Sequence, residues 1–264
     1  GYIEIAKNVN ESNSDFRKTV KLIKAWKSSC KSKDEEFKLK SFHIEQIITK
    51  FFQNNPSADI FDGVFYLFCT IPDWIKCPQI HDRADNSRFI DDYEAELSEI
   101  HKRKVIESRD CFLKKLEELT VNDSISLLFD CCYYNRASKL EQFLFDFNIP
   151  VFIDDETPFE IVGKLQERLG GFRPGDLTKY GKIDIDRKIN FEIKGNQPSA
   201  DYFMWKVKND NECKEPRGDI TKHHTKNVPE KTQYQGTHFV ECYAIKDNIC
   251  IAKARQYVRL IFPG

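Results

Sequence analysis

A pair of aspartates is the first arrangement in this sequence that could carry out chemistry. Asp184 and Asp186 have the D-x-D spacing that places two carboxylates on one face of a strand, as two-metal phosphoryl transfer requires. No glycine–serine loop precedes the pair and no strand with a third carboxylate is evident, so a solvated face of an edge strand is the better interpretation. The motifs G-x-x-x-x-G-K-[ST], G-x-G-x-x-G, H-E-x-x-H and G-x-S-x-G are also missing from the sequence. No residue is therefore assigned as catalytic.

Cysteines and histidines raise the separate question of metal binding. Cys69, Cys77 and His81 could supply three zinc ligands, but no fourth is evident and the spacing matches no common zinc finger. The nine cysteines are odd in number, without a repeated C-x-x-C, and most lie in apolar stretches. This pattern predicts reduced, buried thiols and no metal site. His223 and His224 lie in a polar loop, where they are either incidental or a ligand contact.

The N-terminal part of the sequence is predicted to be helical. Up to about residue 148 the apolar side chains repeat with a helical period, and Phe16, Val20 and Trp26 belong to the first stripe. Ser12, with Asp15 three residues later, resembles a capping box at the start of that helix. Further helices are expected over residues 44–51, 61–68 (ended by Pro72), 93–119, 124–134 and 138–147.

Beyond residue 150 the pattern changes twice. Residues 151–182 are rich in proline and glycine and are predicted to be a linker with one helix over 158–169. Residues 183–264 alternate apolar and polar side chains, which predicts short strands. The predicted fold class is therefore α+β. An all-helical bundle over residues 1–150 precedes a small immunoglobulin-like β-sandwich, with Trp205 as a candidate for its central core aromatic residue.

Composition and charge exclude several classes of protein. The 264 residues include 41 Lys and Arg and 42 Asp and Glu, which excludes a globally basic nucleic-acid coat. No apolar run reaches the roughly 18 residues of a membrane-spanning helix, and no secretory signal is evident, so we expect a cytoplasmic protein without a membrane partner. Residues 181–264 hold 15 Lys and Arg against 11 Asp and Glu, which weakly favours an anionic ligand and gives little support for nucleic acid. Because the chain starts at Gly1 and its only methionine is Met204, we expect a missing upstream domain.

Two segments near the N-terminus resemble a known family. Residues 16–27 (FRKTVKLIKAWK) and 39–45 (LKSFHIE) are similar to the helical half of the cGAS/DncV-like nucleotidyltransferases (CD-NTases) and their oligoadenylate-synthetase relatives. The resemblance covers roughly residues 10–150. It implies that Lys24 and Ser41 reach from the helical lobe to a nucleoside triphosphate held by a catalytic lobe. From the residues alone, Lys24 could equally be a solvated flanking residue and Ser41 an ordinary N-cap.

A second and more specific resemblance lies near the C-terminus. The patterns W-K-V-x-N, R-G-x-I and E-x-T-x-Y-x-G-x-H-x-V-E-C-Y occur in order within residues 185–262 and look like the AGS-C sensor domain. In that family the domain is thought to sense a nucleotide or a related ligand. The resemblance implies that Arg217 could form bidentate hydrogen bonds to a phosphate and that Trp205 or Tyr234 could stack on a base. His238 could donate to a ligand oxygen. The alternatives are that Trp205 is a core residue and that His238 faces inward, bonded to a backbone carbonyl.

Together the two resemblances imply the C-terminal part of a CD-NTase from a bacterial antiphage signalling system of the CBASS type. The helical lobe would complete the triphosphate site, and the β domain would sense a nucleotide or a phage-derived activator. The family's metal-binding carboxylates are not found before Phe16, so no cofactor is expected in this chain and Mg²⁺ is expected only with the catalytic lobe. Two alternatives without catalysis stay open, namely a stand-alone nucleotide-binding sensor and a protein-interaction adaptor.

Overall fold

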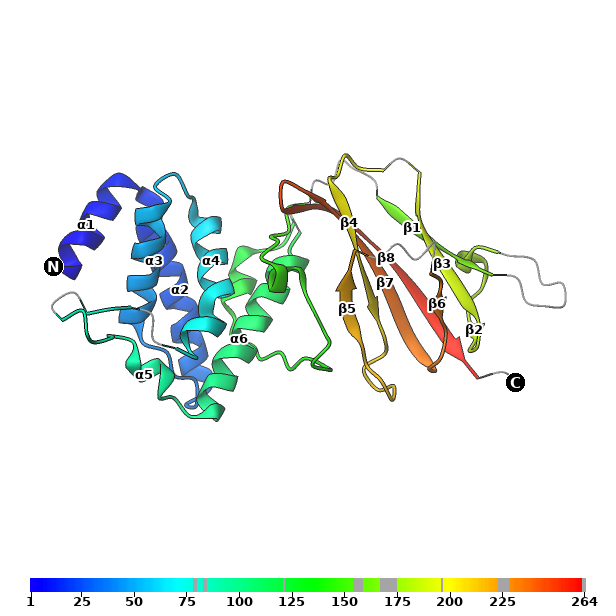
Figure 1. Cartoon of the computed structure of the whole chain (residues 1–264), viewed down its shortest axis with the longest axis horizontal. Helices are drawn as coiled ribbons and strands as arrows, with labels where there is room; N and C mark the ends of the chain where they lie inside the picture. Colours follow the sequence, from blue (N-terminus) through cyan, green and yellow to red (C-terminus); the bar gives the residue numbers. More distant parts are fainter. Residues whose placement is uncertain are drawn as a thin grey trace. The chain divides into compact units, whose positions relative to one another are not determined.

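The computed structural model of the chain describes residues 1–77, 80–82, 85–120, 122–153, 159–166, 175–195, 197–222 and 228–262. These residues divide into two compact units, Gly1–Asn135 and Arg136–Gly264. The α-helices lie in the first unit and the described strands in the second (Figure 1). The predicted α+β class is therefore confirmed, whereas the units divide at residue 135 and not near residue 150.

The first unit packs its helices around a cluster of aromatic side chains. Its elements are α1 (Tyr2–Ser12), α2 (Ser14–Lys33), α3 (Ser41–Asn54), α4 (Ile60–Trp74), α5 (Asp92–Ala95), α6 (Glu99–Glu118) and the 3₁₀ helix η1 (Ile125–Phe129). The predicted stripe of α2 is buried, and the Trp26 ring lies 4.7 Å from that of Phe68 and 5.5 Å from that of Phe37. An isolated β-bridge joins His81 to Phe89, so the unit is mostly but not entirely helical.

The helix boundaries differ from the predicted ones for local reasons. The N-cap of α2 is Asn13, whose side chain accepts a 2.8 Å hydrogen bond from the backbone N–H of Asp15, and Ser12 is the last residue of α1. Pro72 lies inside α4 rather than ending it. The helix expected over residues 124–134 is reduced to the single 3₁₀ turn of η1.

The second unit is built from two β-sheets. Its elements are η2 (Leu144–Phe147), β1 (Glu160–Leu165), η3 (Leu177–Lys179), β2 (Ile183–Asp184), β3 (Lys188–Lys194), β4 (Tyr202–Lys208), β5 (Gly218–Thr221), β6 (Glu230–Lys231), β7 (Gly236–Lys246) and β8 (Ile249–Ile261). One sheet has the strand order β1-β3-β6 and the other β2-β8-β7-β4-β5. The β2–β8 pair is parallel and the other ladders are antiparallel.

The two sheets share one hydrophobic core. Phe191 of β3, Trp205 of β4 and Val258 of β8 belong to a single cluster of buried side chains. Phe191 has polar neighbours on both sides along its strand, as the period of two predicts, because successive side chains point to opposite faces of a sheet. Met204, next to Trp205, is buried in a second cluster with Tyr243 and Ile245. The specific expectation of an immunoglobulin-like sandwich stays a prediction.

The segment before β2 is more structured than the sequence suggested. Residues 160–165, expected to be helical within a linker, form β1 and pair with β3 along their whole length, so the helix prediction is wrong there. Residues 138–147, assigned to the helical bundle, belong to the second unit, where Gln142 donates through its N–H to the carbonyl of Gly218 (2.9 Å). The Gln142 side chain accepts from the N–H of Ile220 (2.8 Å). The turns expected at residues 170–174 lie outside the described residues.

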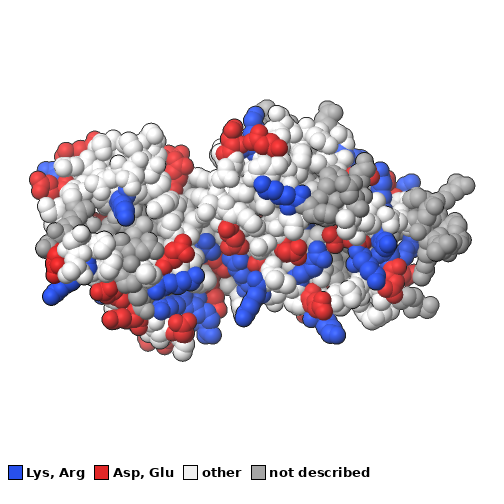
Figure 2. Space-filling model, viewed as in Figure 1, with Lys and Arg blue, Asp and Glu red and all other residues white. Residues whose placement is uncertain are grey.

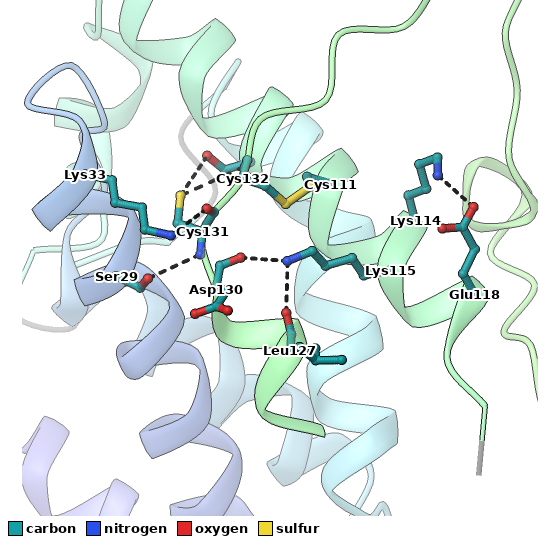
Figure 3. The surroundings of a disulfide bond; sticks show 11 residues. Ser29, Lys33, Cys111, Lys114, Lys115, Glu118, Leu127, Asp130, Cys131 and Cys132 are labelled. Carbon is teal, nitrogen blue, oxygen red and sulfur yellow. Dashed lines mark hydrogen bonds and ion pairs between the residues drawn. A yellow bond between two sulfur atoms is a disulfide. The ribbon is translucent and has the colours of Figure 1, made fainter. Parts of the chain in front are cut away.

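A disulfide bond corrects the expectation that all cysteines are reduced. Cys111 of α6 and Cys132 are joined, with their Cα atoms 5.9 Å apart (Figure 3). Around the bond, Lys115 donates to the carbonyls of Leu127 and Asp130 (both 2.9 Å). The seven other cysteines are outside this disulfide bond.

Charged side chains of both signs are mixed over the surface seen in Figure 2, without one large patch of a single sign. This agrees with the near-equal numbers of basic and acidic residues, 41 and 42. Among the helices whose residues the structure describes, none combines the length and the apolar character needed to cross a lipid bilayer.

Candidate ligand-binding site

The second unit contains a cavity of about 730 Å³ between its two sheets. Its floor is apolar, because inward-facing side chains of β3, β7 and β8 form it; these are Ile189, Phe191, Val240, Val258 and Leu260. All five are buried. The mouth carries the polar groups of β5, β6 and the adjoining loops, namely Asn209, Glu215, Arg217, Asp219, Glu230, Lys231, Thr232, Gln233 and Tyr234. A flat apolar group could therefore lie inside while polar groups contact the rim.

Arg217 is fixed at the mouth by two carboxylates. Its Nε donates to Asp219 at 3.0 Å, and its terminal nitrogen lies 3.4 Å from a carboxylate oxygen of Glu230. The three side chains are half-exposed, at 37%, 38% and 22% respectively. The predicted phosphate-binding arginine thus lines the cavity, but a phosphate would have to compete with two anions for it.

His238 lines the cavity wall with both ring nitrogens occupied. Its Nε2 lies 2.9 Å from the carbonyl of Tyr234, and its Nδ1 accepts from the backbone N–H of Asp210 at 3.2 Å. Because a carbonyl can only accept, the ring is neutral with its proton on Nε2. Burial lowers the pKa of His238, opposed by the Tyr234 carbonyl and by Asp210. This geometry agrees with the alternative interpretation of the sequence, in which His238 faces inward and its ring is hydrogen-bonded to a backbone carbonyl.

Of the two candidate stacking residues, Tyr234 lines the cavity and Trp205 does not. Tyr234 lies at the cavity mouth, and its hydroxyl bonds to Glu215, an interaction that raises the pKa of the phenol. Trp205 is only 2% exposed and does not line the cavity. It packs in the core beside Phe191 and Val240, so the core alternative describes its position.

The described residues that line the cavity do not give its mouth a positive formal charge. Two cations, Arg217 and Lys231, face three carboxylates, Glu215, Asp219 and Glu230, for a formal sum of −1 with neutral His238. Within the part of the chain that the structure describes, the excess of basic side chains in residues 181–264 is therefore not concentrated at this mouth.

Asp219 and Glu230 are functional candidates that the sequence reasoning missed. Asp219 follows Arg217 by two residues, so an extended backbone places both side chains on one face, and this signal was readable. Glu230 has no comparable local signal, because it meets Arg217 only through the approach of β5 to β6, which belong to different sheets.

The two candidates of the helical unit lie along one seam between α2 and α3. Lys24 forms an ion pair with Glu45 at 2.5 Å, and Lys27, one turn later on α2, donates to the Ser41 hydroxyl at 2.8 Å. Ser41 is the first residue of α3. Lys24 and Ser41 therefore share one side of the unit, as a common ligand would require.

The described residues contain no group of three or more Cys, His, Asp or Glu side chains placed to hold a metal ion. Cys69, Cys77 and His81 are thus not gathered into a zinc site. Asp184 ends β2, which is an edge strand as the sequence predicts, and Asp186 has a left-handed backbone with φ 60°. The pair His223–His224 lies outside the described residues.

Comparison with known families identifies the second unit. Residues 138–261 match the Adenylyl/Guanylyl and SMODS C-terminal sensor domain (AGS_C). The match begins just after Arg136, the first residue of the unit, and ends with β8. The similarity to AGS_C thus covers almost the whole second unit and none of the first. Searches of curated proteins and of solved structures gave no match.

Proposed function

We propose that this chain is the C-terminal part of a CD-NTase, in which the AGS-C unit binds a small nucleotide-like ligand and the helical unit completes a nucleoside triphosphate site. The observation that carries the proposal is that the AGS-C match contains a cavity lined by Arg217, Tyr234 and His238. Its volume, about 730 Å³, suits a small organic ligand, since such sites usually measure about 300–1,000 Å³.

The helical unit supports the second half of the proposal through the polar groups of its α2–α3 seam. Lys24 and Lys27 lie opposite the start of α3, where backbone N–H groups and the helix dipole favour an anion. A triphosphate bound here would compete with Glu45 for the ammonium group of Lys24. Because these side chains are 37% and 33% exposed, breaking their ion pair costs about 1 kcal/mol or less.

In this proposal, nucleotidyl transfer takes place in a catalytic lobe, whose carboxylates would hold Mg²⁺. The AGS-C unit would respond to a nucleotide or a phage-derived activator within a cytoplasmic antiphage system of the CBASS type. The two sequence resemblances and the AGS-C match support this assignment.

Calorimetry on the full chain tests the proposal with mono-, di- and cyclic nucleotides. Val207→Phe places a larger side chain in the cavity and is expected to abolish binding. Val162→Phe is the matched control, because Val162 lies on β1 outside the cavity lining. No heat of binding with any nucleotide would contradict the sensor proposal and favour the adaptor.

A further inference from the structure

The charges at the cavity mouth restrict which end of a ligand can enter. Glu215, Asp219 and Glu230 line the cavity together with Arg217 and Lys231, and the carboxylates of Asp219 and Glu230 already neutralise the guanidinium of Arg217. A phosphate inserted here would be repelled by three anions and would have to displace at least one carboxylate from Arg217. The mouth therefore disfavours recognition led by phosphate.

The same carboxylates favour a ligand edge made of hydrogen-bond donors. An ionised carboxylate only accepts and offers about four lone-pair sites, so Asp219 can accept from Arg217 and from a ligand at the same time. Hydrogen bonds to ionised groups are roughly twice as strong as neutral ones. Arg217 thus acts as a positioning residue that holds the two carboxylates at the mouth.

The cavity floor favours a planar apolar ring. Phe191, Val240 and Leu260 present buried side chains to the cavity, and Tyr234 stands at the rim. A heteroaromatic base can lie against such a surface and lose its contact with water, while its polar edge faces the mouth.

We infer that the cavity binds the base of its ligand, that the base presents adjacent N–H donors to Asp219 or Glu230, and that the phosphates stay outside. Among the common bases, guanine has this edge, because N1–H and the 2-amino group are neighbours and can bind one carboxylate together. Adenine places an acceptor, N1, beside its amino group and would meet the carboxylate unfavourably. This inference rests on the proposed sensor function, since it concerns the same cavity.

Calorimetric titration of the full chain with guanosine, inosine, adenosine, GMP and GTP tests the inference. We expect guanosine to bind within about threefold of GTP, with little dependence on salt, because the phosphates make no close contact. Inosine, which lacks the 2-amino group, should bind about tenfold more weakly, and adenosine more weakly still. Asp219→Asn should weaken guanosine binding about tenfold or more.

Glu160→Gln is the matched control, because it removes one carboxylate from β1 at an exposed site outside the cavity. It should leave all affinities unchanged. If GTP binds more than tenfold more tightly than guanosine and salt weakens it, the inference is overturned while ligand sensing stands. Equal affinities for adenosine and guanosine would overturn the donor-edge assignment. Absence of binding by every probe would overturn the sensor function as well.

Discussion

The guanidinium of Arg217 lies 3.4 Å from the carboxylate of Glu230, and this ion pair connects two different β-sheets. Arg217 directly precedes β5, an edge strand of the larger sheet, whereas Glu230 begins β6, an edge strand of the smaller one. The contact spans the mouth of the cavity, so it affects both the shape of the opening and the charge that a ligand meets there.

Arg217→Ala should weaken ligand binding by about 10- to 100-fold, since it releases the carboxylates of Asp219 and Glu230 from their fixed positions. The melting temperature should change little, because a half-exposed ion pair contributes about 1 kcal/mol or less. Calorimetry of guanosine and GTP, with thermal melting alongside, checks both points. A loss confined to GTP would instead assign Arg217 to phosphate binding.

Gly236→Ala should destabilise the second unit by about 2 kcal/mol. Gly236 has φ +136°, and a Cβ there would lie 2.7 Å from the Cβ of Asp210. A shift of Asp210 to make room would break the hydrogen bond that its carboxylate accepts from the backbone N–H of Thr237 at 2.8 Å. Urea denaturation gives the change, with Gly181→Ala as control, since nothing lies within 4 Å of a Cβ at Gly181. Equal effects of the two variants would contradict this account.

The free energy of unfolding should fall as the pH drops through about 6.5, partly because of His238. Burial lowers the pKa of His238 in the folded state, so the unfolded chain binds the proton more readily and acid favours unfolding. Above the unfolded pKa the stabilisation is fully present. Urea denaturation at about pH 7.5 and pH 5 should show a smaller loss for His238→Gln than for the natural chain. Identical losses in both proteins would remove His238 from this role.

Seven thiols should react with a thiol reagent in denaturant without reductant, and nine after reduction, because Cys111 and Cys132 are joined. With a sequence separation of 21 between the two cysteines, this cross-link should stabilise the chain by about 3 kcal/mol. Cys111→Ser should lower the free energy of unfolding by about the same amount, whereas Cys77→Ser, at an exposed cysteine outside this disulfide bond, should not. Nine reactive thiols before reduction would refute the bond.

Lys24→Ala, in a protein that joins this chain to an active catalytic lobe, should raise the KM for the nucleoside triphosphate with a smaller effect on kcat. The reason is loss of a cation at the start of α3. Lys18→Ala is the control, because Lys18 lies on the same helix and pairs with Asp15 at an exposed site. Unchanged kinetics for Lys24→Ala would remove that residue from the site.

Periodicity was a sufficient guide where a strand or helix buries one continuous face. It predicted the buried stripe of α2 and the strands β3 and β8. It also located β4 and β7, although these two strands bury side chains on both faces of their sheet. It failed for β1, where Gly163 occupies an inward position and leaves room for Leu177 and Phe191. An inward glycine removes the apolar side chain on which the alternating pattern depends.

The candidate site was only partly predictable. Of the four residues that the motif resemblance singled out in the β unit, Arg217, Tyr234 and His238 line one cavity and Trp205 does not. Their role in binding a ligand stays a prediction. The resemblance gave no information on Glu230, whose contact depends on how two sheets approach each other. The disulfide was also hidden, because the approach of Cys132 to α6 follows from tertiary packing and not from the spacing of 21 residues.

The hydrogen bonds of Gln142 to Gly218 and Ile220 have a practical consequence for anyone isolating the second unit. A fragment that starts at residue 150 would lose both of these bonds. It would also lose Leu144 and Ile149, whose burial covers Met204 and Tyr243 of the larger sheet. Such a shortened protein would expose this apolar surface to solvent and aggregate. A fragment that begins at Arg136 keeps the residues that cover the outer face of the larger sheet.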